Sequence, residues 1–227
     1  MITGFGMITF RPMAILYYSP GAASLLPHWL LIELGIPHEL RLLDFASKQQ
    51  KSADYLALNP SGVVPTLVLD GRPMTEAAAI ALHLADTHPQ ARLVPAADEP
   101  ARRDCLQWMF HLAQAVQSLF RIWWYPHEVA GGVQADSVQA DAARAHVQPR
   151  IEAAWDRIDA HLAANGPYLL GAAPCVADFY LTMLMRWSRH MPRPATAWPH
   201  LAAHAVRMKA RPSFAALYAA EGLEEWA

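Results

Sequence analysis

The stretch Asn59-Pro60-Ser61-Gly62-Val63-Val64-Pro65-Thr66-Leu67-Val68-Leu69 decides the fold of the first part of this chain. Asn-Pro-Ser-Gly is a turn sequence, and the apolar run after Pro65 is typical of a buried strand. A proline at the start of a strand cannot donate to a neighbouring strand. A cis bond before Pro65 costs only about 0.5–1 kcal/mol and would aim the backbone amide of Val64 outward. The alternative is an ordinary turn with no further role.

The segments around this stretch alternate between strand and helix patterns. The expected strands are 14–18, 38–43 and two short runs on either side of Asp70-Gly71, and the expected helices are 22–34, 52–58 and 76–87. Asp-Gly between two apolar runs is a strong hairpin signal. A strand, a helix and a second strand in succession predict a right-handed parallel crossover. The predicted order is therefore βαβ followed by ββα.

Beyond residue 100 every long segment has helical spacing. The clearest helical segments are 101–125, 137–165 and 177–190, with shorter ones near 200–210 and 213–221, and breaks at Gly131-Gly132 and Asn165-Gly166-Pro167. Residues 89–100 are rich in proline and alanine and read as a linker. We therefore expect an α/β domain at 13–88 and an all-helical domain at 101–227, with residues 1–12 as a loose extension.

The composition excludes several classes of protein. The net charge of −2 over 227 residues gives no electrostatic reason for binding nucleic acid or an anionic membrane. No apolar run approaches the roughly 20 residues of a membrane span, and the N-terminus lacks the pattern of a secretory signal. The two cysteines and eleven histidines show no metal-ligand spacing, so we expect no metal. Few cysteines with no disulfide pattern fit the cytoplasm.

Five segments in this order resemble the glutathione transferase superfamily, most closely its bacterial beta-like branch. The segments are Tyr17-Tyr18-Ser19-Pro20-Gly21-Ala22-Ala23-Ser24-Leu25, Asn59–Pro65, Thr75-Glu76-Ala77-Ala78-Ala79-Ile80, Val176-Ala177-Asp178-Phe179-Tyr180-Leu181 and Arg211-Pro212-Ser213. The resemblance covers nearly the whole chain from about Ala14. It implies a thioredoxin-like domain that binds glutathione, and a helical domain that completes a pocket for an electrophile.

In such a protein glutathione is the nucleophile, and the protein must keep its thiol ionised. A helix N-terminus and a hydrogen-bond donor both lower the pKa of a thiol. The resemblance makes Ser24 the leading donor, although an N-cap role would equally explain a serine there. Tyr18 is the second candidate, since a phenol also donates, but a tyrosine that ends a buried strand more often packs.

The resemblance also assigns the contacts to glutathione. Val64 presents its backbone to the cysteinyl part, with Pro65 in the cis form. Glu76 and the amide of Ala77 receive the γ-glutamyl group at a helix N-terminus, whereas Glu76 could instead only favour the helix dipole. Lys48 meets the glycyl carboxylate, with Lys51 close enough to replace it.

The chain departs from the beta-like pattern at Ala23, at the pair Gln117-Ser118 and at Ala77. Ala23 stands where these proteins commonly have cysteine, so no mixed disulfide with glutathione can form there. Gln117-Ser118 stands where a His-Lys pair is usual, which removes a cationic contribution to the thiolate. Ala77 stands where serine is frequent, which removes a hydroxyl contact.

The second substrate is the least defined part of the prediction. Trp124 and Tyr125, with Gln117, are candidates for the electrophile pocket, although aromatics there could equally belong to the core or to a dimer interface. We expect a glutathione transferase that acts on a small hydrophobic electrophile, as a homodimer, with glutathione as co-substrate and no permanent cofactor. The alternatives are a glutathione-dependent peroxidase, isomerase or dehalogenase, or a non-enzymatic ligand-binding or partner-binding protein.

Overall fold

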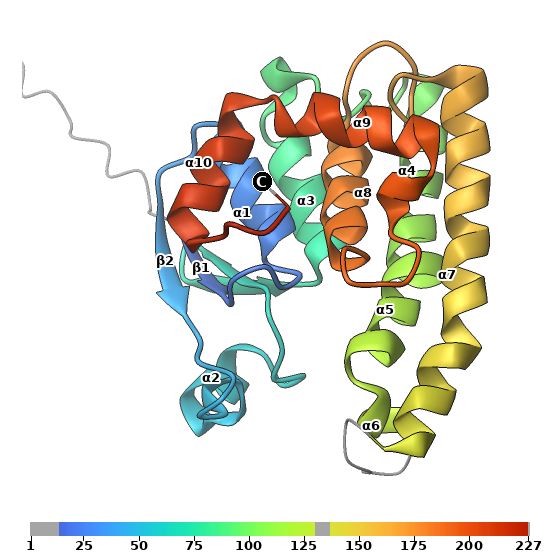
Figure 1. Ribbon diagram of the computed structural model, residues 1–227. Coiled ribbons are helices and arrows are strands. Elements are labelled where there is room, and N and C mark those ends of the chain that lie inside the picture. The colour runs from blue at the N-terminus through green and yellow to red at the C-terminus, as the bar shows by residue number, and fades with distance from the viewer. Residues whose placement is uncertain (1–13, 130–136, 227) are drawn as a thin grey trace, which may run out of the picture.

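The computed structural model describes residues 14–129 and 137–226. The predicted extension at 1–12, the domain start at residue 13 and the Gly131-Gly132 break lie outside the described residues. A four-stranded mixed sheet is followed by a bundle of helices (Figure 1). The predicted combination of a thioredoxin-like α/β unit and a helical part is confirmed.

The sheet has the strand order β2-β1-β3-β4. Its strands are β1 (Ala14–Tyr18), β2 (His38–Leu42), β3 (Thr66–Leu69) and β4 (Arg72–Thr75). β1 pairs in parallel with β2 and antiparallel with β3, so that Leu16 lies opposite Leu40 on one side and Leu67 on the other. The predicted parallel crossover and the hairpin at Asp70-Gly71 are both confirmed.

Three helices belong to the α/β part, α1 (Leu25–Glu33), α2 (Ala53–Leu58) and α3 (Ala77–Asp86). α1 and α3 pack against each other. α1 begins at Leu25 rather than at Ala22, because residues 20–24 form a separate turn between β1 and the helix. This turn becomes one wall of the site described below.

The second half of the described chain is helical. Its helices are α4 (Ala101–His111), the π-helical segment η3 (Leu112–Gln117), α5 (Ser118–Trp124), α6 (Pro126–Val129), α7 (Val138–Asn165), α8 (Val176–Trp187), α9 (Pro199–Lys209) and α10 (Pro212–Glu221), and single 3₁₀ turns are η1 (Gln49–Lys51), η2 (Pro89–Ala91) and η4 (Ala195–Ala197). Figure 1 shows α4, α5 and α7 as long parallel columns, with α8 between them and the α/β part.

One hydrophobic core runs through both halves. Trp29 of α1 is fully buried, and its ring meets Phe179 of α8 at 4.8 Å and Phe214 of α10 at 5.3 Å between centroids. The predicted division into domains at 89–100 stays a prediction, since this core is continuous. Among the described helices, none combines the length and the apolar character that crossing a membrane requires.

Candidate active site

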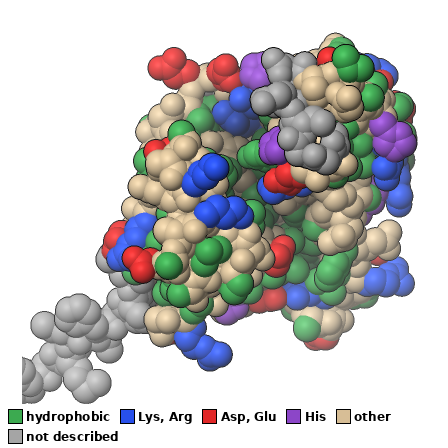
Figure 2. All heavy atoms as spheres, turned by 90° about the horizontal axis from the view of Figure 1, so that it is seen from below, with side chains coloured by type: hydrophobic (Ala, Val, Ile, Leu, Met, Phe, Trp, Pro, Cys, Tyr) green, Lys and Arg blue, Asp and Glu red, His purple; other side chains and the backbone are tan. Residues whose placement is uncertain are grey.

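A cavity of about 880 Å³ lies between the two halves of the molecule. One wall comes from the α/β part, namely residues 19–23, Phe45 and residues 63–64. The opposite wall comes from η3, α5, the end of α8 and residues 222–225 after α10. Figure 2 shows this face of the molecule hollowed near its centre, with acidic and basic side chains beside the hollow.

The turn between β1 and α1 forms the floor of the cavity, and it is the main part of the wall that the α/β part contributes. The amide of Ala22 donates to the carbonyl of Ser19 at 3.1 Å, and the amide of Leu25 donates to the carbonyl of Ala22 at 3.0 Å. Ala22 and Ala23 therefore stand immediately before the first turn of a nine-residue helix, where backbone amides favour a bound anion. Ala23 lines the cavity, and its contact with glutathione stays a prediction.

Gly21, at the centre of this turn, is held by two helices from the far end of the chain. Its amide donates to Glu221 Oε2 at 2.8 Å, and its carbonyl accepts from Trp187 Nε1 at 2.8 Å. Its φ of +68° is one that residues with a side chain rarely adopt. A Cβ here would come within 2.6 Å of Arg186 Nη1, so the guanidinium would have to move to admit a side chain.

Ser24 does not face the cavity in this structure. The residue is fully buried, and its hydroxyl lies 3.2 Å from both the amide nitrogen and the carbonyl oxygen of Ser19. Ser24 occupies the N-cap position of α1, but its hydroxyl makes no capping hydrogen bond, so the prediction of a side-chain cap is wrong. The hydroxyl instead forms hydrogen bonds with the backbone of Ser19, which follows the end of β1.

Tyr18 lies beside the turn but outside the set of cavity-lining residues. Its ring stands 6.0 Å from the ring of His28. Burial, followed by the negative charge of Glu221, raises the pKa of the Tyr18 phenol. The phenol therefore stays protonated and could donate, but its place beside His28 and outside the cavity lining favours the packing role.

The Val64-Pro65 peptide bond is cis, as predicted. Tyr55 Oη and Asn59 Nδ2 donate to the carbonyl of Val63 at 2.6 and 2.8 Å, and both side chains also bond to Thr66 Oγ1. The turn residue Asn59 is therefore a buried anchor. Val64 lines the cavity, and neither its N–H nor its C=O bonds to another described residue.

The remaining residues expected to bind glutathione lie apart from the cavity walls. Glu76 is exposed at the start of α3, with φ of +69° and no side-chain cap bond, and Ala77 is buried behind it. A positive φ at a non-glycine residue is uncommon and frequently accompanies a functional role. Lys48 is exposed, and Lys51 Nζ donates to the carbonyl of Ser61 at 3.3 Å.

All three residues expected in the electrophile pocket line the cavity, namely Gln117, Trp124 and Tyr125. Gln117 Oε1 accepts from the hydroxyl of Tyr180. Burial, followed by the charge of Glu76, raises the pKa of Tyr180 far above its usual value, so this hydroxyl remains a donor. Gln117 ends the π-helical segment η3, a kind of distortion that is common at functional sites.

Sequence reasoning missed Ser19, Arg186 and Glu221. Ser19 and Arg186 line the cavity, and Glu221 supports its floor. The sequence Ser19-Pro20-Gly21 is a turn signal, and it could have indicated that Ser19 lies in the loop that forms the cavity wall. For Arg186 and Glu221 no local signal existed, because their positions follow from the packing of α8 and α10 against α1.

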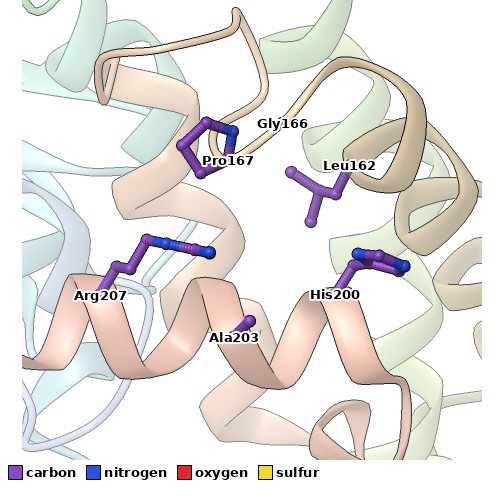
Figure 3. A pocket seen from close by; sticks show the side chains of 6 residues that line it. All are labelled: Leu162, Gly166, Pro167, His200, Ala203 and Arg207. Atoms are coloured by element: carbon purple, nitrogen blue, oxygen red, sulfur yellow. The ribbon is translucent and has the colours of Figure 1, made fainter.

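A second cavity, of about 430 Å³, lies at the far end of the helical part. Figure 3 shows His200, Ala203 and Arg207 on α9 facing Leu162 of α7 and the loop residue Pro167. It contains none of the predicted site residues. Within the described residues, no group of three or more His, Cys, Asp or Glu side chains could hold a metal ion, and Cys105 and Cys175 are free, buried thiols.

Comparison with known proteins agrees with this geometry. Residues 24–87 match the model of the glutathione S-transferase N-terminal domain, and residues 141–207 match that of the C-terminal domain. The glutathione S-transferase GST-4.5 of Xanthomonas campestris is 32% identical over 92% of this chain and 98% of its own length.

Solved structures give the same result. A beta-class glutathione S-transferase of Sphingomonas chungbukensis superposes with a TM-score of 0.80 at 32% identity, over 92% of this chain and all of that chain. A sphingomonad glutathione S-transferase in complex with glutathione superposes with a TM-score of 0.79 at 33% identity, over the same shares. The chain described here belongs to the glutathione S-transferase family.

Proposed function

We propose that this protein is a glutathione transferase in which the turn at residues 19–24 holds the thiol of glutathione as a thiolate. The thiolate then attacks an electrophile in the cavity of about 880 Å³. One observation carries the proposal: the cavity joins the N-terminus of α1 to the unpaired backbone of Val64. The free N–H and C=O of Val64 can pair with the backbone of an extended peptide such as glutathione. The N-terminus of α1 can lower the pKa of a thiol placed beside it.

The donors to the thiolate follow from the turn. The backbone amides that precede α1 offer positive partial charge, which lowers a thiol pKa from about 8.5. The hydroxyl donor that we propose is Ser19, because it lines the cavity and because, among the described residues, only its backbone N–H and C=O form hydrogen bonds. Ser24 is then a positioning residue, since its hydroxyl holds both backbone groups of Ser19.

The rest of glutathione is assigned to residues on either side of this turn. Val64 pairs with the cysteinyl backbone, Glu76 and the amide of Ala77 receive the γ-glutamyl group, and Lys48 receives the glycyl carboxylate. The free carboxylate and unusual φ of Glu76 support its assignment.

We also propose that the protein is a cytoplasmic homodimer. Phe110 on α4 is 65% exposed, and a second subunit that covered this ring would remove apolar area from water. Light scattering after size exclusion gives the mass directly. A mass of one chain at micromolar concentration would contradict the dimer.

The test of function is binding of glutathione by calorimetry, together with a titration of the bound thiol by thiolate absorbance. We expect saturable binding and a thiol pKa below that of free glutathione. Ser19→Ala should raise the bound thiol pKa and lower kcat with little change in the Kd of glutathione. Ser24→Ala should also lower thermal stability, because the hydroxyl is part of the turn.

Two results would contradict parts of this proposal. Absence of binding at millimolar glutathione would remove the function itself. A thiol pKa that is unchanged by Ser19→Ala but raised by Ser24→Ala would restore Ser24 as the direct donor.

A further inference from the structure

One cation in the cavity has no acidic partner within the described part of the chain. Arg186 is only 5% exposed, yet it lines the cavity at the end of α8. Its Nε donates to the hydroxyl of Tyr218 at 3.0 Å. Within the described residues, Nη1 and Nη2 have no hydrogen-bond acceptor, and no carboxylate forms an ion pair with the guanidinium.

The other two arginines of the cavity are already neutralised. Arg189 Nε lies 2.8 Å from Glu225 Oε2, and Arg121 Nε lies 2.7 Å from Glu128 Oε2. Of the remaining acids, Glu224 is exposed at the rim, and Glu221 is occupied by Gly21 and His28. Burying a charge is costly unless it is paired, so the missing acceptor is expected from whatever fills the cavity.

We propose that Arg186 binds the carboxylate of the electrophile, and that the preferred electrophiles join an aromatic body to a carboxylate group. A planar guanidinium with two free nitrogens matches a carboxylate in a two-bond arrangement. The aromatic body has Phe120, Trp124 and Trp187 beside it on the same wall. This proposal rests on the proposed function, since it names the substrate class of that same site.

Glutathione also carries carboxylates, so the source of the anion must be decided. The two carboxylates of glutathione are assigned above to Lys48 and to the amide of Ala77. Arg186 reaches the cavity from α8, on the helical side of Gly21. The electrophile therefore supplies the carboxylate that reaches Arg186.

The test compares a chlorodinitrobenzoate with its methyl ester at saturating glutathione. In both reactions a carbon–sulfur bond forms at the ring, the carbon–chlorine bond breaks, and chloride leaves with the bonding electrons. The thiol proton has already been released to solvent. The ester keeps the ring and the leaving group but lacks the charge. The kcat/KM of the acid divided by that of the ester therefore measures recognition of the carboxylate.

Arg186→Gln should lower that ratio by about 10- to 100-fold, the loss expected for a hydrogen bond between charged groups. Arg186→Lys keeps the charge and should restore part of the ratio. Arg189→Gln removes a cation of the same wall that Glu225 already neutralises, and should change the ratio by less than about 3-fold. Thermal unfolding of each variant shows whether it is folded.

A second measurement does not depend on turnover. Calorimetry with the unreactive dinitrobenzoate and its methyl ester, in the presence of glutathione, should show tighter binding of the acid, lost in Arg186→Gln. An equal loss for acid and ester, or a rise in the KM of glutathione alone, would overturn the proposal. Binding of dinitrobenzoate together with no conversion of the chlorodinitrobenzoate or its ester would contradict the proposed function instead.

Discussion

Gly21 is the residue at which β1, α8 and α10 meet, and its geometry gives a sharp prediction. Gly21→Ala adds a strained φ, costing about 1–2 kcal/mol, and a contact with Arg186 that should cost about 1–3 kcal/mol more. Gly71→Ala is the matched control, because Gly71 has φ of +73° and no atom within 4 Å of the position that a Cβ would take. Urea unfolding of both variants gives the two losses in the free energy of unfolding, and their difference measures the contact with Arg186. Equal losses would show that the Arg186 side chain moves aside at no cost.

The residues of the site differ in how far the sequence alone could identify them. Val64-Pro65 was predictable, because a turn sequence and a proline before an apolar run are local signals. Trp124 and Tyr125 were predictable from the cluster of aromatic residues around them, and Gln117 only through a family resemblance. The orientation of the Ser24 hydroxyl was not predictable from the sequence, since it depends on whether the backbone of Ser19 lies within reach of that hydroxyl. Glu221 lies 200 residues from Gly21, and no local pattern links them.

At the scale of elements, Asp178 fastens the start of α8 to its surroundings. Its Oδ1 accepts from the amide of Leu169 and lies 2.9 Å from His204 Nε2, and its Oδ2 accepts from the amide of Cys175 at 2.8 Å. Asp178→Ala leaves three buried donors without an acceptor and should cost about 3–5 kcal/mol. Asp104→Ala, at an exposed position of α4, is the control, with an expected loss below about 1 kcal/mol. Similar losses in urea unfolding would contradict this role.

The contact between α1 and α10 predicts a dependence of stability on pH. Burial raises the pKa of the Glu33 carboxyl, but hydrogen bonds from Arg211 and Ser213 and the charge of Arg211 outweigh burial and lower it. A carboxyl with a lowered folded pKa stabilises the protein above its unfolded pKa of about 4.3, and that stability is lost as the pH falls further.

Glu33→Gln should therefore reduce stability at neutral pH and flatten the loss of stability that sets in below about pH 4.3. Thermal unfolding across the acid range measures the slope. Arg211→Met serves as the companion variant, because it removes the main cause of the lowered pKa and should flatten the same range. If stability falls with pH as steeply in both variants as in the unaltered protein, other carboxyls cause the acid sensitivity.

The elements themselves were largely predictable, and their exceptions have physical causes. The strands, the Asp70-Gly71 hairpin and the break at residues 165–167 follow from local turn chemistry and periodicity. The π-helical segment η3 could not be foreseen, since it arises within an otherwise regular helical pattern. The late start of α1 follows from tertiary bonds to Gly21, which replace the first helical turn.

At the scale of the whole molecule, the continuous core predicts that both halves unfold together. Trp29 stands where they meet, with its Nε1 donating to Ser213 Oγ at 2.8 Å and its ring between Phe179 and Phe214. We expect far-ultraviolet circular dichroism and tryptophan fluorescence to report one coincident transition in urea. Trp29→Ala should cost about 3–5 kcal/mol and weaken the junction, so that the two probes separate. Separate transitions in the unaltered protein would instead show that residues 13–88 and 101–227 fold as independent domains.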